Sequence, residues 1–118
     1  MSDELTITMS IKFSKDGAEI PNRRETLSID VTGDSFTHQV LSIGTAEEEL
    51  TQSADLGTPG WCFVKNFDDT NYVEVGLTGS YTVKVKAGES ALFRFDGATM
   101  YAKANTAACL VEYIIVED

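Results

Sequence analysis

The sequence predicts an all-β protein: a single antiparallel β-sandwich domain over residues 1–118, with a jelly roll as the expected strand arrangement. Three observations support this. Apolar and polar residues alternate with a period of two rather than 3.6. Turn signals separate short strands about every 8 to 12 residues, which is the spacing of sandwiches and small barrels. Tight turns dominate the second half, so most strand pairs are expected to be antiparallel.

The first strand is expected at the N-terminus. Leu5 to Phe13 alternate apolar and polar side chains, which is typical of a half-buried strand. Ser14 to Gly17 follow as a turn. A second strand is expected where Leu27, Ile29 and Val31 alternate with polar residues. The pair Arg23-Arg24 lies between these strands, and we expect it in a solvated loop rather than in a binding patch.

The middle of the chain is less regular. A strand is expected over residues 36–43, where neither face is clean enough to say which points inward. Residues 46–52 include Glu47-Glu48-Glu49, the best helix composition in the protein. Their short length and flanking Thr and Ser favour an acidic edge strand or loop. A breaker cluster, Leu56 to Gly60, follows.

The second half is a series of hairpins. Further strands are expected over residues 61–65, 72–77, 81–86, 91–95, 100–103 and 109–116. Residues 61–65 are almost continuously apolar, which predicts a strand covered on both faces. Residues 109–116 are also apolar on both faces. The segment Asn66 to Asn71 between strands is rich in Asp and Asn, which favour turns.

Composition excludes several classes of partner. The chain has 118 residues, a mass of 12.9 kDa and a formal charge of −10. So acidic a chain argues against a nucleic-acid partner and against an anionic membrane surface. An apolar fraction of 42% is too high for a disordered chain. The first ten residues carry two acids and no base, so no signal peptide is expected.

No metal or cofactor is expected. Cys62 and Cys109 lie in apolar runs and are expected as reduced core residues, with a disulfide possible only if their strands are neighbours. Zinc prefers four ligands, and the chain has one histidine. A calcium loop is the alternative for the oxygen-rich turn of Asn66, Asp68, Asp69 and Asn71, but its spacing does not match an EF-hand. A turn without an ion is expected.

No catalytic residues are expected either. His38 is the single imidazole, and no Gly-x-Ser-x-Gly motif accompanies it. The acidic residues resemble a solvated surface more than the paired carboxylates of a glycosidase. An alternative is a carbohydrate-binding module, with the aromatic side chains Trp61, Tyr72, Tyr81 and Tyr101 stacking on sugar. Exposure of these side chains on one flat face would favour that hypothesis.

Four segments resemble small structural proteins of tailed bacteriophages. They are Gly57 to Gly76, Leu92 to Phe95, Tyr101 to Ala108 and Val111 to Asp118, and the resemblance covers roughly the last 60 residues. It consists of strands, turns and a C-terminal ending rather than a catalytic motif, so no functional residue is transferred.

The resemblance implies a non-enzymatic virion protein, made in the host cytoplasm, with a capsid decoration (cement) protein as the leading hypothesis. Its partners would be the major capsid protein and copies of itself, with trimers favoured at local three-fold axes. A tail or neck component is the alternative, as is the carbohydrate-binding module of a host-recognition fibre. Ser2 to Phe13 are a candidate for pairing with a neighbour through an open sheet edge.

Overall fold

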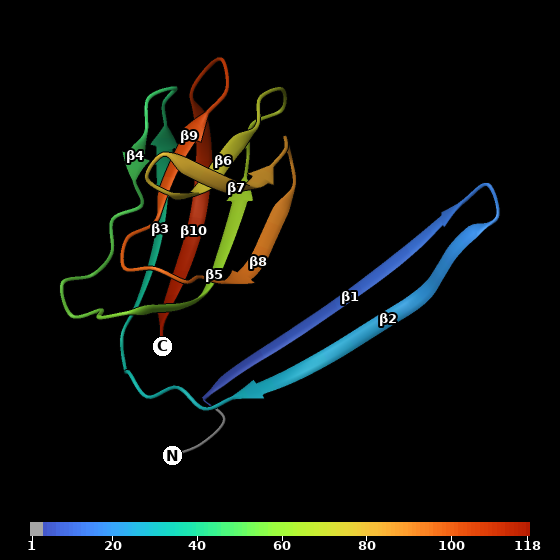
Figure 1. Ribbon diagram of the computed structural model, residues 1–118, viewed down its shortest axis with the longest axis horizontal. Coiled ribbons are helices and arrows are strands. Elements are labelled where there is room, and N and C mark those ends of the chain that lie inside the picture. Colours follow the sequence, from blue (N-terminus) through green and yellow to red (C-terminus); the bar gives the residue numbers. More distant parts are fainter. Residues whose placement is uncertain (1–3) are drawn as a thin grey trace. The chain divides into compact units, whose positions relative to one another are not determined.

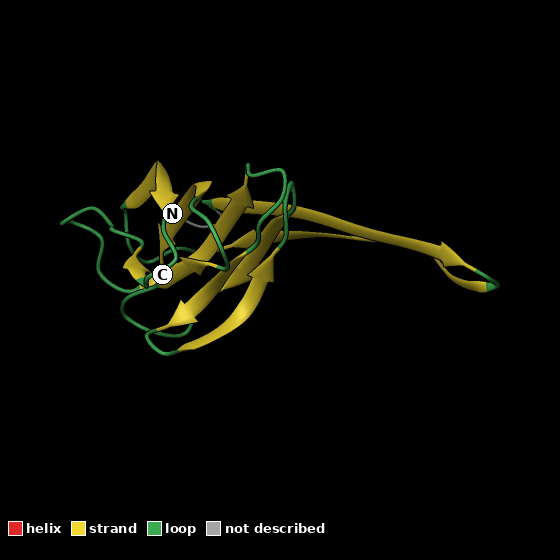
Figure 2. Cartoon of the chain, turned by 90° about the horizontal axis from the view of Figure 1, so that it is seen from above, coloured by secondary structure: helices red, strands yellow, loops and turns green. Residues whose placement is uncertain are grey.

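The structure, a computed structural model, describes residues 4–118, and every regular element in this range is a β-strand (Figure 2). The strands are β1 (Leu5–Lys15), β2 (Ala18–Ile29), β3 (Phe36–Ile43), β4 (Glu48–Glu49), β5 (Pro59–Asn66), β6 (Val73–Leu77), β7 (Ser80–Val85), β8 (Ser90–Arg94), β9 (Tyr101–Ala104) and β10 (Cys109–Glu117). All strand pairs are antiparallel. The all-β prediction is confirmed.

The chain divides after Thr32 into two units. The first holds β1 and β2, which form a two-stranded sheet of their own, the hairpin (Figure 1). The second holds β3 to β10, which form a β-sandwich of two four-stranded sheets. We expected the sandwich to include the N-terminal strand, but β1 pairs only with β2 among the described strands.

The hairpin turns at Asp16-Gly17. The backbone φ angles there are 50° and 88°, so both residues occupy the left-handed region. A two-residue turn of this kind matches the right-handed twist of the strands on either side, and Asp-Gly is one of its preferred sequences. The second strand therefore starts immediately after the turn, at Ala18.

The expectation of a loop at Arg23-Arg24 was wrong. Both residues lie inside β2, opposite Ile11 and Ser10 of β1. Their composition suggested a loop because residues 21–25 offer no apolar alternation. Pairing with a regular partner strand overrides that weak local preference.

The sandwich has nested strand pairing. Its first strand pairs with its last, β3 with β10, and further inward β4 pairs with β9, β5 with β8 and β6 with β7. These strand pairs are arranged in two sheets, with the strand orders β3-β10-β5-β8 and β4-β9-β6-β7. In this unit, β6 and β7 are the only consecutive strands that lie in the same sheet. Every other link between consecutive strands crosses from one sheet to the other.

The core lies between the two sheets. It includes Ile43, Val64, Val75, Met100 and Ile115, all fully buried. In β3 the inward face is that of Thr37 and Ile43, which resolves the orientation that the sequence left open. Tyr113 is also fully buried, and its hydroxyl donates to the Thr51 carbonyl oxygen at 2.6 Å. This bond satisfies its one polar group.

The prediction for residues 46–52 is confirmed. They contain the two-residue strand β4, which lies at the edge of its sheet and pairs with β9. Leu50 follows directly and is fully buried, because its amide bonds to the Met100 carbonyl at 2.8 Å and holds it beside the core.

A carboxylate near the C-terminus holds two loops together. Glu117 accepts hydrogen bonds from the amides of Gly57, Asp34 and Ser35 at 2.7, 3.0 and 3.1 Å. The bond from Gly57, and then those from Asp34 and Ser35, lower the pKa of this carboxyl, because they stabilise its charged form. The segment that enters β3 is thereby fastened to the end of β10.

A core truncation tests the packing of the sandwich. Ile115→Ala is expected to lower the free energy of unfolding by about 3 kcal/mol, because it leaves a cavity in a fully buried site. Ile20→Ala, at a residue 41% exposed in the hairpin, is the matched control and should change it by about 0.5 kcal/mol or less. Denaturant unfolding monitored by the fluorescence of Trp61, the single tryptophan, measures both. Equal losses would contradict the assignment of the core.

An acid titration tests the role of Glu117. A carboxyl with a lowered pKa stabilises the fold above its unfolded pKa, and that contribution disappears as the pH falls through the folded value. The wild type should therefore lose stability below its ordinary pKa of 4.5. Glu117→Gln should be less stable near pH 7 and less sensitive to pH in the acid range, as measured by thermal melting. An unchanged pH profile would contradict this assignment.

Candidate functional site

The hairpin has one strongly apolar face. Cross-strand partners point to the same side of an antiparallel sheet, and successive residues alternate between sides. The register therefore places these side chains on one face, the hairpin apolar face: Leu5, Ile7, Met9, Ile11, Phe13, Ile20, Leu27 and Ile29. Ile11 and Phe13 are 58% and 47% exposed. The expectation of a half-buried strand over Leu5 to Phe13 holds at Leu5, which is half-buried, and at Ile7, which is 6% exposed, and it was wrong from Met9 onward.

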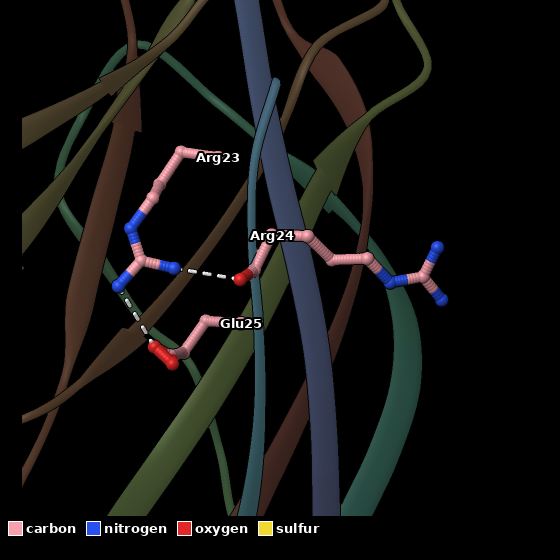
Figure 3. A network of polar contacts seen from close by, with 3 residues as sticks. All are labelled: Arg23, Arg24 and Glu25. Atoms are coloured by element: carbon pink, nitrogen blue, oxygen red, sulfur yellow. Dashed lines mark hydrogen bonds and ion pairs between the residues drawn. The ribbon is translucent and has the colours of Figure 1, made fainter.

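Charges interrupt the hairpin apolar face at its middle. Arg23 lies opposite Ile11 and Glu25 opposite Met9, and the two form an ion pair at 3.1 Å. Figure 3 shows this pair, with the Arg23 guanidinium also donating to the Arg24 carbonyl oxygen at 2.6 Å, while the Arg24 side chain points away. An open hollow of about 400 Å³ lies beside Met9, Ile11 and the ion pair.

The sheet β3-β10-β5-β8 presents a second apolar surface. Its inward residues alternate with outward ones, which define the outer sheet face. Register places most of these outward side chains in rows across the strands: His38, Ile114, Phe63 and Leu92; then Val40, Glu112, Lys65 and Ser90; and then Ser42 and Leu110. At the other end Phe36 pairs with Val116 and Trp61 with Arg94, and a register shift between β10 and β5 separates the two pairs. Phe36 is 64% exposed, and Val40 is 55% exposed.

This outer sheet face contradicts one sequence prediction. Residues 61–65 were expected in a strand covered on both faces, yet Trp61 and Phe63 are only half-buried, whereas Cys62 and Val64 on the inner side are buried. In β10, Leu110 is 50% exposed on the outer side. The side chains of these strands have the apolar character of a sheet covered on both sides, but within the sandwich unit no strand covers their outer side.

The charge of the chain is unevenly distributed. The first unit, residues 1–32, carries a formal charge of −2, and the second unit, residues 33–118, carries −8. Within the first unit the strands and the turn of the hairpin are slightly basic. Residues 5–29 hold four basic and three acidic side chains, a formal charge of +1. Residues 30–118 hold five basic and fourteen acidic side chains, a formal charge of −9. The acidity of the chain is therefore concentrated outside the hairpin.

His38 lies on the outer sheet face. Its Nε2 atom is 2.6 Å from Oε2 of Glu112 on the neighbouring strand, and its side chain is 47% exposed. The two residues stand in adjacent rows among Val40 and Ile114. The arrangement provides a histidine–carboxylate pair on an apolar surface.

The cysteines are buried and free. Burial raises the pKa of the Cys62 thiol to about 12 and also raises that of Cys109. Their strands β5 and β10 are neighbours, and neighbouring strands were the condition for a disulfide between the two cysteines. However, Cys62 pairs with Ile115, six residues along β10 from Cys109, or about 20 Å at the usual strand rise. Register rather than strand order keeps them apart.

The oxygen-rich turn is occupied by its own hydrogen bonds. Asp68 accepts from the amides of Thr70 and Asn71 at 3.0 and 2.6 Å, and these bonds lower its pKa. Asn66 accepts from the Asp68 amide at 2.9 Å, and Asn71 accepts from the Thr106 hydroxyl at 2.6 Å. Within residues 4–118, no group of three or more His, Cys, Asp or Glu side chains is placed to hold a metal ion.

The candidate sugar-stacking aromatics do not share one face. Trp61 lies in one sheet of the sandwich, whereas Tyr81 and Tyr101 lie in the other and Tyr72 precedes β6. Several of the rings are also covered by cations. Lys84 Nζ lies 4.3 Å from the Tyr72 ring centre, and Lys103 Nζ lies 5.0 Å from that of Tyr81. These contacts occupy ring faces that a sugar would need.

One further hollow lies in the sandwich. It has a volume of about 300 Å³ and is lined by residues of β6, β7, β8 and the segment after β8. Val75, Leu77 and Phe93 supply apolar walls, while Arg94 and Asp96 supply charge. The hydroxyl side chains of Ser80 and Thr82 complete its lining.

Sequence reasoning found the end of the second hairpin strand at Leu27 and Ile29, but it missed residues 18–26 of that strand and the outer sheet face. The signal for the hairpin was Asp16-Gly17, since a two-residue turn implies that a strand resumes at once. The signal for the outer sheet face was the apolar character of residues 61–65 and 109–116 on both sides. That pattern was recognised, but it was interpreted as burial within one chain.

Thiol labelling tests the burial of the cysteines. Cys62 should react at least about a thousandfold more slowly in the native protein than in the unfolded one, because its pKa rises from 9.0 to about 12 and the thiolate is the reactive form. Mass spectrometry of labelled peptides at pH 8 follows each cysteine separately. Rapid labelling of Cys62 in native protein would contradict its placement in the core.

No helix within the described residues has the length and apolar character needed to cross a membrane. Comparison of the chain with protein-family models, with curated proteins and with solved structures found no match.

Proposed function

We propose that this protein is a non-enzymatic structural subunit that assembles in many copies, and specifically that it decorates the capsid shell of a tailed phage. The observation that carries the proposal is the pair of exposed apolar surfaces, the outer sheet face and the part of the hairpin apolar face formed by Met9, Ile11, Phe13 and Ile20. Monomeric proteins rarely leave large contiguous apolar patches exposed, whereas assembling subunits require them. The resemblance of the last 60 or so residues to small phage structural proteins supplies the choice of assembly.

The strand order supports a jelly roll, the form that this proposal favours. Eight strands pair first with last and so on inward, and all links but one cross between the sheets. This is the arrangement of a long hairpin rolled into two sheets. Jelly rolls occur in viral capsid proteins and also in lectins, so the topology agrees with the proposal without selecting it.

The chemistry of the sandwich supports a role without catalysis. The two cysteines are held as thiols in the core, and His38 pairs with Glu112 on an apolar surface rather than beside a hydroxyl nucleophile. The proposal therefore assigns this surface to protein contact.

A tail or neck component is the second candidate within the same class. Its support is the same open surface, because tail subunits also assemble by covering apolar faces. A carbohydrate-binding module has less support, because the aromatic rings are divided between two sheets and Tyr72 and Tyr81 are covered by lysines.

Binding to purified shells tests the proposal. The chain should bind shells that lack it until a fixed number of copies per shell is reached, and it should not bind shells that already carry it. Sedimentation of the shells followed by quantitative gel analysis measures this. Binding to tails alone would replace decoration with the tail hypothesis. No binding to shells or tails would contradict a virion role.

A further inference from the structure

We propose that the hairpin apolar face of one copy docks on the outer sheet face of a second copy of this chain. This inference deepens the proposed function and rests on its central idea, that the protein is an assembly subunit. It names the partner that covers each surface.

Both apolar surfaces are stabilised when another element packs against them and removes them from water. A two-stranded hairpin is marginally stable in water, and packing against another element is what stabilises it. The outer sheet face belongs to a four-stranded sheet that is already held by the sandwich, but no element of the sandwich packs on it. Its central strands β10 and β5 carry apolar side chains on both sides of the sheet. Each copy therefore supplies one surface of each kind, so every surface can be covered in an assembly of this chain alone.

Charge favours this occupant. The strands and turn of the hairpin, residues 5–29, carry a formal charge of +1 within a first unit of −2, and the sandwich unit, residues 33–118, carries −8. Two hairpins placed face to face would lack this attraction, because they carry the same charge. A hairpin on the sandwich of another copy brings opposite charges together, which favours association and suppresses the like pairing.

The charged groups within the two surfaces also match. Arg23 and Glu25 are adjacent at the middle of the hairpin apolar face. Glu112 and Lys65 are cross-strand neighbours at the middle of the outer sheet face, with His38 bonded to Glu112. The middle of each surface therefore presents one carboxylate beside one cation, while Arg94 at the end of the outer sheet face is already paired with Asp118 at 2.8 Å. Docking can pair Arg23 with Glu112 and Glu25 with Lys65, so no charge is left unpaired in the contact.

Such a contact determines the symmetry. The two surfaces are different, so the contact is heterologous, and repetition either closes a ring or extends a filament. A closed ring covers every hairpin and every outer sheet face. The trimer expected at local three-fold axes is the smallest cyclic ring beyond a dimer, so it satisfies this requirement.

Paired aspartate variants test the contact. Ile11→Asp on the hairpin and Val40→Asp on the outer sheet face should each weaken self-association about 100-fold or more, because each places an unpaired carboxylate in an apolar contact. Thr8→Asp, on the opposite hairpin face, and Thr82→Asp, on the other sheet, are matched controls that should leave self-association unchanged. Native mass spectrometry and sedimentation of the full chain measure the oligomer. Because the substituted side chains are all exposed, the fold is expected to persist, and circular dichroism checks it.

Mixing the two variants gives the sharpest result. Ile11→Asp keeps an intact outer sheet face, and Val40→Asp keeps an intact hairpin, so together they retain one good contact. The mixture should form a one-to-one heterodimer and no ring. If Val40→Asp alone associates like the wild type, hairpins contact one another or another protein, and the proposed contact is wrong.

Charge reversal tests the polar pairing. Arg23→Glu and Glu112→Arg should each weaken association through like charges, and the double variant should recover most of it. Failure of the double variant to recover would overturn the pairing of these two residues.

The shell experiment separates the two proposals. A wild type that remains monomeric at all concentrations yet saturates shells would overturn the self-contact and leave the proposed function standing. An oligomer that obeys the variant pattern but ignores shells and tails would support the self-contact and overturn the virion role.

Discussion

The structure depends on one constraint: an apolar face of a β-sheet must be removed from water, and each sheet has two faces. The sandwich satisfies this constraint between its sheets, where residues such as Val64 and Ile115 are fully buried. It does not satisfy it on the outer side of β3, β10, β5 and β8, nor does the hairpin along Met9 to Phe13. Hydrophobic burial of about 25 cal/mol per Å² makes such surfaces the strongest source of binding energy that the molecule offers.

Much of the sandwich could be predicted from the sequence, because its determinants are local. Apolar runs placed β5 and β10 close to their observed bounds, the residue pattern of 36–43 placed β3, and the breaker and turn residues placed the connections. Register could not be predicted, since a pattern of alternation does not say which strand lies opposite which. Cys62 and Cys109 illustrate this: their strands are neighbours, yet six residues of β10 separate the two positions.

The candidate surfaces were harder to predict for a different reason. Alternation shows that a side chain belongs in an apolar environment, but it does not show which molecule provides that environment. Leu5 to Phe13 and residues 61–65 were both interpreted as buried in their own chain, and the structure leaves Ile11 58% exposed and Leu110 of the neighbouring strand 50% exposed. The mismatch between an apolar pattern and an exposed position is therefore informative, and the proposed contact surfaces are inferred from it.

The most direct measurement is the rate of methionine oxidation by hydrogen peroxide, followed by peptide mass spectrometry in dilute and in assembled protein. Met9 lies on the hairpin apolar face and is 38% exposed, and Met100 is fully buried and serves as the internal standard. If the open surfaces are contact surfaces, Met9 should oxidise quickly in dilute protein and slow toward the rate of Met100 on assembly. Oxidation of Met9 at one unchanged rate in both states would contradict the account.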